Sequence, residues 1–215
     1  MKLATKIAGA TLVCVAPIIG RSDLLVHPAV TLAVALLAAT WLTQPDDHVR
    51  TTARLSGEKL SLVLITLGSV GAIVAGLIEL RLKANSSVAT SVATSLASLL
   101  AGFALAAAGF VCRLWAIRTL GRFFTSSLDV ARDQRVVETG PYRFVRHPAF
   151  FGVLLSGIGL AAALQSIAAL ATCLLVLLPA YLFRIRREED RLVASLGKPY
   201  QAYQARTAML IPFVL

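Results

Sequence analysis

Residues 150–183 read FFGVLLSGIGLAAALQSIAALATCLLVLLPAYLF, an almost unbroken apolar run. A helix needs about 20 residues to cross the hydrocarbon core of a bilayer, so this run is too long for one crossing and long enough for two. Gln165 and Ser166 are the only two polar residues in this run that follow each other directly. We therefore predict a tight helical hairpin, with one helix over about 149–164 and the next over about 167–185.

The rest of the chain has the composition of a membrane protein. Hydrophobic residues make up 57% of the 215 residues, charged residues 15%, and the mean hydropathy is +0.77. Backbone polar groups find no partner in lipid, so apolar segments cross a bilayer as helices. Four further spans are predicted, over about 4–20, 24–43, 60–80 and 92–117. The predicted fold is an all-α polytopic membrane bundle of about six transmembrane helices.

The basic residues indicate how these spans are oriented. The net charge of +10 would suggest a nucleic-acid partner in a soluble protein. In a chain with apolar spans, the positions of the basic residues instead indicate which ends of the spans lie in the cytoplasm, because Lys and Arg are retained on the cytoplasmic side. With the N-terminus inside, only Arg21, Arg81 and Lys83 of the 21 basic residues fall outside. We predict an integral multi-pass protein with both termini in the cytoplasm and no nucleic-acid partner.

The polar segment 44–59 carries residue types that could bind a metal, namely Asp46, Asp47, His48 and Glu58. Their spacing is not that of a regular ligand set. A solvated loop is the preferred interpretation, and no metal site is predicted.

Two charged segments flank the predicted hairpin, and the hairpin brings both to one membrane surface. We name residues 118–147 the link and residues from 184 onward the tail. The link ends in the sequence GPYRFVRHP, residues 140–148. Pro148 suits the first position of the following helix, whose N-terminal N–H groups favour an anion. Arg143, Arg146 and His147 stand beside it. The alternative is that the arginines mark topology and that His147 is a simple helix cap.

The tail combines acidic and aromatic residues. Glu188 and Glu189 follow a basic run, and simple pairing with neighbouring arginines is their alternative role. Tyr200, Tyr203 and Arg206 recur every three residues, which places them on one helix face. Link and tail together supply an anion site, carboxylates for a cation and aromatic faces for a flat ring. S-adenosylmethionine has all of these groups.

At these residues the chain resembles a known family. The run Arg146-His147-Pro148-x-Phe150-x-Gly152 is similar to the RHPxYxG motif of the isoprenylcysteine carboxyl methyltransferase family. The tail is similar to its EExxL motif and to its GxxYxxY motif with a following arginine. The resemblance covers about residues 109–212. Phe150 departs from the family tyrosine, so a hydrogen bond there is not expected, while ring packing still is.

The resemblance implies a cytoplasmic S-adenosylmethionine pocket in a domain over 109–215, preceded by N-terminal transmembrane helices over 1–108. The loop around Val137–Tyr142, together with Arg146, His147 and Pro148, is expected to hold the methionine part. Glu188 or Glu189 would face the amino group and the sulfonium, and Tyr200 and Tyr203 would line the pocket. The expected cofactor-binding residues are Val137, Gly140, Tyr142, Arg146, His147, Pro148, Glu188, Glu189, Tyr200 and Tyr203. Arg206, expected to orient the acceptor, and Glu189 are the predicted catalytic residues.

The reaction that the resemblance implies is carboxyl O-methylation of a lipophilic, isoprenylcysteine-like acceptor that enters from the bilayer. A carboxylate nucleophile needs no base, whereas an amine or a thiol needs one, and the link offers few bases beyond His147. A phospholipid amine or a small thiol remains an alternative acceptor. A non-catalytic scaffold or transporter component is the alternative from another class.

Overall fold

The computed structural model describes residues 19, 22–43, 56–85, 96–125 and 133–211. All regular elements in these ranges are helical, and one isolated bridge joins Val145 to Ala208. The elements are α2 (Ser22–Leu25), α3 (Pro28–Leu42), α4 (Ser56–Asn85), α5 (Leu96–Leu120), η3 (Gly121–Phe123), η4 (Gly140–Arg143), α6 (Pro148–Ala163), α7 (Ile167–Thr172), η5 (Cys173–Leu177), α8 (Leu178–Leu196) and α9 (Lys198–Arg206). The all-helical prediction is confirmed for the described residues.

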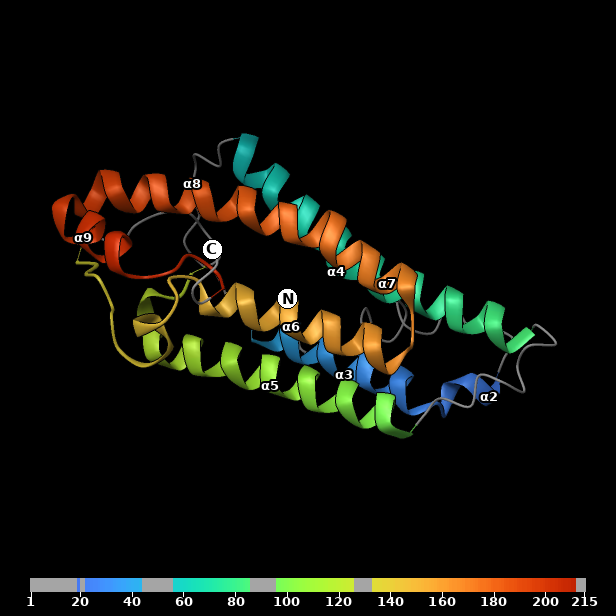
Figure 1. The fold of residues 1–215 in the computed structure, drawn as a ribbon. Helices are drawn as coiled ribbons and strands as arrows, with labels where there is room; N and C mark the ends of the chain where they lie inside the picture. Colours follow the sequence, from blue (N-terminus) through green and yellow to red (C-terminus); the bar gives the residue numbers. More distant parts are fainter. Residues whose placement is uncertain (1–18, 20–21, 44–55, 86–95, 126–132, 212–215) are drawn as a thin grey trace.

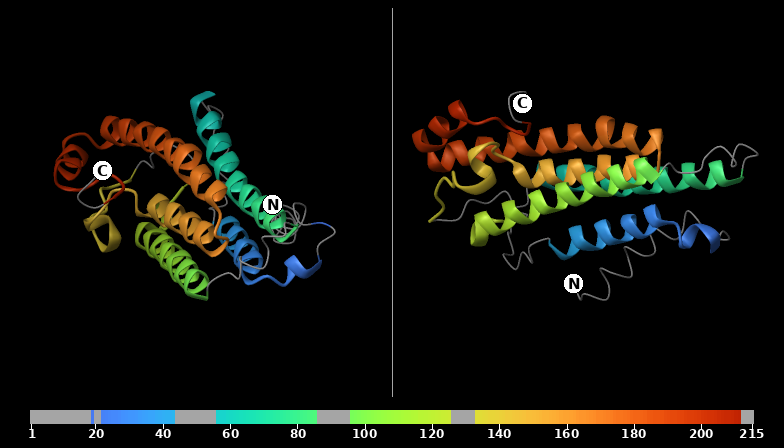
Figure 2. Two further views of the ribbon diagram at one scale, coloured as in Figure 1. Left: turned by 45° about the vertical axis from the view of Figure 1, so that its right-hand side comes forward. Right: turned by 60° about the horizontal axis from the view of Figure 1, so that its bottom comes forward.

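The long helices lie alongside one another as a membrane bundle (Figures 1 and 2). Three stretches are long and apolar enough to cross a membrane, namely Leu60–Ala84, Leu96–Phe123 and Ile167–Leu196. Pro28–Leu42 and Pro148–Ala163 are apolar but shorter. The chain is therefore an integral membrane protein. Helices occupy five of the six predicted spans, and the span predicted over 4–20 lies outside the described residues.

The hairpin turns where the sequence predicts it. Ser166 caps α7 by accepting a hydrogen bond from the backbone N–H of Ala169, at 3.0 Å. Glu79 of α4 accepts hydrogen bonds from the Ser166 hydroxyl at 2.5 Å and from the Ala168 N–H at 3.0 Å. Lys83 pairs with Glu79 at 2.7 Å and donates to the Gln165 carbonyl, also at 2.7 Å. Two residues one helical turn apart on α4 thus fix the loop between the two helices of the hairpin.

The second helix of the hairpin continues further than expected. The stretch Ile167–Leu196 is 30 residues long, about 45 Å at 1.5 Å per residue, whereas the predicted span ends near residue 185. A hydrocarbon core is only about 30 Å thick. The charged last third of this helix therefore extends the hairpin beyond the apolar part of the bundle and carries Glu188 and Glu189 with it.

Helices α5 and α6 pack closely because small residues face each other between them. A side-chain carbon on Gly109 would lie 2.5 Å from the backbone oxygen of Gly152. Gly102 meets the α6 backbone in the same way, at Gly159 and Ala163. Small residues at such contacts let helix backbones approach and gain van der Waals contact in lipid. This contact fixes the start of α6, and with it the end of the link, against α5.

Candidate active site

The link and the tail lie side by side. The backbone N–H of Arg146 donates to the carbonyl of Ala208 at 2.8 Å, and that of His147 donates to the carbonyl of Met209 at 3.1 Å. Figure 1 shows the link in yellow and α9 in red at the same end of the bundle. Two segments about 60 residues apart in sequence thus form one structure at the base of the hairpin.

Glu189 is the centre of a polar cluster that we name the clasp, made of Arg146, His147, Glu189 and Gln204. One carboxylate oxygen accepts from Nε of Arg146 at 2.6 Å and lies 3.2 Å from Nε2 of His147. The other accepts from the side chain of Gln204 at 3.1 Å. Arg146 also donates through Nη1 to the carbonyls of Gln204 and Thr207. The clasp joins α8, α9 and the end of the link.

Three tyrosines form a second connection between link and tail. Tyr142, Tyr200 and Tyr203 are all buried. The hydroxyl of Tyr203 donates to the backbone carbonyl of Tyr142 at 2.6 Å, and the Tyr200 and Tyr203 rings meet edge to face with centroids 5.9 Å apart. Burial, together with the nearby carboxylates of Glu189 and Glu188, raises the pKa of Tyr200 above its usual value. Its hydroxyl therefore stays protonated and can donate a hydrogen bond.

The start of α6 matches the expectation from the sequence. Pro148 occupies the first turn, and His147 precedes it without capping the helix through its side chain. The His147 ring instead stacks on Phe150, with centroids 5.9 Å apart, and Phe150 stacks on Tyr181 at 4.9 Å. The ring packing expected at Phe150 is confirmed. His147 is 6% exposed.

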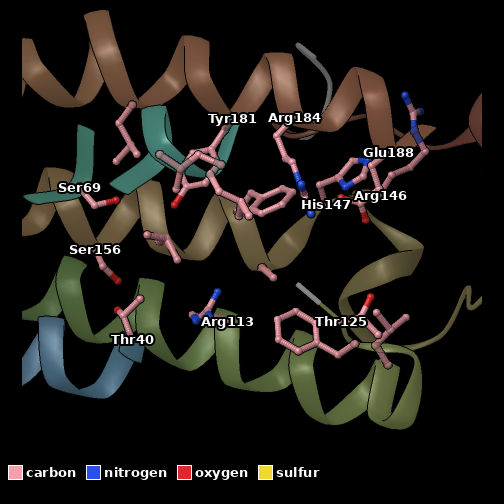
Figure 3. A pocket seen from close by; sticks show the side chains of 18 of the residues that line it. Thr40, Ser69, Arg113, Thr125, Arg146, His147, Ser156, Tyr181, Arg184 and Glu188 are labelled. Atoms are coloured by element: carbon pink, nitrogen blue, oxygen red, sulfur yellow. The ribbon is translucent and has the colours of Figure 1, made fainter. Parts of the chain in front are cut away.

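A cavity of about 280 Å³ runs from this cluster into the apolar part of the bundle (Figure 3). Of the predicted site residues, seven line it: Val137, Tyr142, Arg146, His147, Glu188, Tyr200 and Tyr203. The remaining wall is mainly apolar and comes from α3, α4, α6 and the second helix of the hairpin, including Leu36, Ile65, Ile73, Val153, Leu160 and Leu177. Polar groups therefore cluster near the base of the hairpin, while the other walls suit hydrocarbon.

Four predicted residues do not line the cavity. Glu189 lies behind Arg146 and His147, in the clasp. Pro148 is fully buried at the start of α6. Gly140 is the first residue of η4, has a φ of +59° and packs against α5. A side-chain carbon there would lie 2.8 Å from Oγ1 of Thr119, so a glycine is needed for η4 to begin at this position. The side chain of Arg206 is 58% exposed and pairs with Glu138 of the link. Its role toward the acceptor stays a prediction.

Two buried arginines in the cavity wall were missed by the sequence analysis. Arg113 of α5 and Arg184 of α8 are 4% and 3% exposed. Arg184 donates to the hydroxyl of Ser61 at 3.4 Å. A signal was available for Arg113, because a charged residue inside a predicted span is costly and usually functional.

The sequence is similar to those of known membrane methyltransferases. The family model described as phospholipid methyltransferase matches residues 97–198. Protein-S-isoprenylcysteine O-methyltransferase B of Arabidopsis thaliana is 30% identical over 115 residues, which are 53% of this chain and 58% of that protein. The protein-S-isoprenylcysteine O-methyltransferase of Schizosaccharomyces pombe is 28% identical over 180 residues, 76% of each chain.

A solved structure has the same fold. It is that of the eukaryotic intramembrane Ras methyltransferase ICMT, and it matches 99% of this chain and 75% of its own with a TM-score of 0.61 and 19% identity. This chain spans less than two thirds of the Arabidopsis relative, and the family model matches the part that holds the link, the hairpin and the beginning of the tail. The chain is thus similar in sequence to protein-S-isoprenylcysteine O-methyltransferases and shares the membrane helical fold of the solved ICMT structure.

Proposed function

We propose that this protein is an S-adenosylmethionine-dependent membrane methyltransferase that methylates the carboxylate of a lipid-linked, isoprenylcysteine-like acceptor. The observation that carries the proposal is a continuous cavity that joins the link and the tail to an apolar chamber among the membrane helices. Such a cavity suits a reaction between a polar methyl donor and a lipophilic acceptor.

The residues at the polar end fit the proposed cofactor by their chemistry. Glu188 is a half-buried carboxylate in the cavity wall, suited to an ammonium or sulfonium group. Tyr200 and Tyr203 supply buried aromatic rings and Tyr200 a protonated hydroxyl. S-adenosylmethionine, when bound, supplies a methyl group activated by a sulfonium. We assign its methionine part to the loop from Val137 to Tyr142 and to His147.

The two glutamates have different roles in this proposal. Glu188 faces the cofactor from the cavity wall. Glu189 acts through Arg146 and His147, which it holds in place by charge-assisted hydrogen bonds. The carboxylate of Glu189 is thus a positioning group behind the cavity.

The apolar wall suits the hydrocarbon part of the acceptor. Leucine, isoleucine and valine side chains from four helices line it, and burying each methylene of a prenyl chain contributes about 0.8 kcal/mol. This binding free energy can hold the acceptor carboxylate near the polar end. Holding two reactants in line can supply about 7–11 kcal/mol of the barrier.

The proposed reaction balances without acid or base. A carboxylate oxygen of the acceptor attacks the methyl carbon, an O–CH3 bond forms, the S–CH3 bond breaks and its electron pair stays on sulfur. No proton moves, and both charges disappear in the products. The protein's task is to align the acceptor and to exclude water.

We also propose that the polar end of the cavity faces the cytoplasm, with both termini on that side. Support comes from exposed basic residues beside it, Arg186 and Arg187 on α8, since Lys and Arg are retained on the cytoplasmic side. In a Gln201→Cys variant the new thiol lies on the exposed face of α9. We expect a membrane-impermeant thiol reagent to label it from the cytoplasmic side of sealed vesicles, and labelling from the opposite side would refute this orientation.

The test of function is methyl transfer by the purified protein. Labelled S-adenosylmethionine is offered with N-acetyl-S-farnesylcysteine, with a phosphatidylethanolamine or with a small thiol. We expect label in the methyl ester of the farnesylcysteine. Transfer to the amine or the thiol alone would refute the carboxylate acceptor but not the reaction class. Failure to bind S-adenosylhomocysteine and to label any acceptor would refute both.

A further inference from the structure

Arg113 is a charged residue buried inside the helical bundle. It lies on α5, within the membrane-spanning stretch Leu96–Phe123, and is 4% exposed. Its side chain lines the cavity, and Figure 3 shows it pointing from α5 toward the space that His147 and Glu188 approach from other elements. A cation at this depth requires a physical reason, because removing a charge from water is costly unless the charge is paired.

The guanidinium of Arg113 is only partly satisfied. Its Nε donates to the hydroxyl of Thr43 at 3.2 Å, and its carbon lies 5.8 Å from the centre of the Phe124 ring. Its Nη2 is buried and has no hydrogen-bond partner among the residues that the structure describes. No carboxylate in those same ranges forms an ion pair with it. An anion brought by a ligand would complete this group.

The charges around the cavity favour an anionic ligand. Four arginines are among its described lining residues, Arg113, Arg135, Arg146 and Arg184, whereas Glu188 is the one acidic residue among them. Arg146 is neutralised from behind by Glu189. Arg113 has no such anion behind it among the described residues, and it is a buried arginine of the cavity wall with an unpartnered donor.

We propose that Arg113 binds the carboxylate of the acceptor through Nη2 and thereby selects acidic acceptors. This inference rests on the function proposed above. Thr43 holds Nε, so the Nη groups are the donors left for a ligand. In the proposed complex one carboxylate oxygen accepts from Nη2, and the other attacks the methyl group. Forming the ester removes the anion, so Arg113 loses its partner and the neutral product is released.

Acceptor binding can be measured without turnover. The probes are N-acetyl-S-farnesylcysteine and its carboxamide, which has a similar shape but no charge, each titrated into the protein saturated with S-adenosylhomocysteine. The wild type is expected to bind the carboxylate roughly 10- to 100-fold more tightly than the carboxamide, the range for a hydrogen bond to a charged group. In Arg113→Gln this preference is expected to disappear, and in Arg113→Lys to return in part.

Two controls separate the possible failures. Arg118→Gln removes an exposed arginine from the same helix and is expected to leave the preference unchanged. Binding of S-adenosylhomocysteine by Arg113→Gln, at wild-type affinity, shows that the variant is folded.

Equal binding of the two probes by the wild type, or an unchanged preference in Arg113→Gln, would overturn the inference. So would loss of S-adenosylhomocysteine binding in both Arg113 variants, because Arg113 would then serve the cofactor or the fold. Absence of methyl transfer by a wild type that prefers the carboxylate would refute the proposed function alone.

Discussion

Replacing Glu189 with glutamine tests whether the clasp builds the cofactor end of the cavity. The carboxylate of Glu189 receives Arg146 at 2.6 Å, His147 at 3.2 Å and Gln204 at 3.1 Å, and its side chain is 12% exposed. Glutamine has one acceptor oxygen, and its amide nitrogen would face a donor. The Arg146 charge would remain buried without an anion.

The size of the effect follows from these contacts. Removing one partner of a buried ion pair costs about 3–5 kcal/mol, and because glutamine keeps one acceptor we expect about 3 kcal/mol. A free-energy change of about 1.4 kcal/mol corresponds to a tenfold change in affinity. If the link and the tail must be joined for the cofactor to bind, the affinity for S-adenosylhomocysteine therefore falls by at most about 100-fold.

The assay is calorimetric titration with S-adenosylhomocysteine, together with thermal unfolding in detergent. Asp190→Asn is the matched control, because it removes a neighbouring carboxylate that is exposed on the same helix. We expect Glu189→Gln to lower both the affinity and the melting temperature relative to Asp190→Asn. If the two variants behave alike in both measurements, the clasp does not build the site.

Four other changes probe separate parts of the structure. Glu188→Gln removes the cavity carboxylate. A hydrogen bond to a charged group contributes about 1.5–3 kcal/mol, so S-adenosylhomocysteine should bind at least about tenfold more weakly while the melting temperature stays the same. Unchanged affinity would contradict the role of Glu188. Tyr203→Phe deletes the 2.6 Å bond to the link and should cost about 1 kcal/mol, seen as a lower melting temperature. Gly109→Leu places a side chain where a backbone oxygen of α6 lies at 2.5 Å, so we expect little folded protein by size-exclusion chromatography, whereas Ala107→Leu on the exposed face should fold normally. Arg206→Ala should abolish labelled methyl transfer while S-adenosylhomocysteine still binds, and normal turnover would eliminate its predicted role.

The hairpin could be predicted in detail because its cause is local. A long apolar run broken by Gln165 and Ser166 can cross a bilayer twice only by turning there. The convergence of link and tail followed from the same geometry, because both flank the hairpin and must meet at its base. The contacts of Arg146 and His147 with Ala208 and Met209 confirm it.

The sequence analysis left open which glutamate faces the cavity. Successive helix residues differ by about 100° in direction, so Glu188 and Glu189 point to different surroundings. A signal was available, because Ile185, Leu192 and Leu196 recur at helical spacing, and Glu188 lies three residues after Ile185 and four before Leu192, on the same face. The tertiary contacts decide it, by directing Glu189 toward Arg146 and leaving Glu188 in the wall of the cavity.

The sequence alone therefore determined the membrane class, the hairpin and the segments that carry the site, because span length and hydropathy are properties of contiguous residues. Tertiary structure decided that Glu189 holds the site from behind, that Arg206 pairs at the surface and that Arg113 enters the cavity. These outcomes depend on helix rotation and on close packing between α5 and α6, which join residues far apart in the chain.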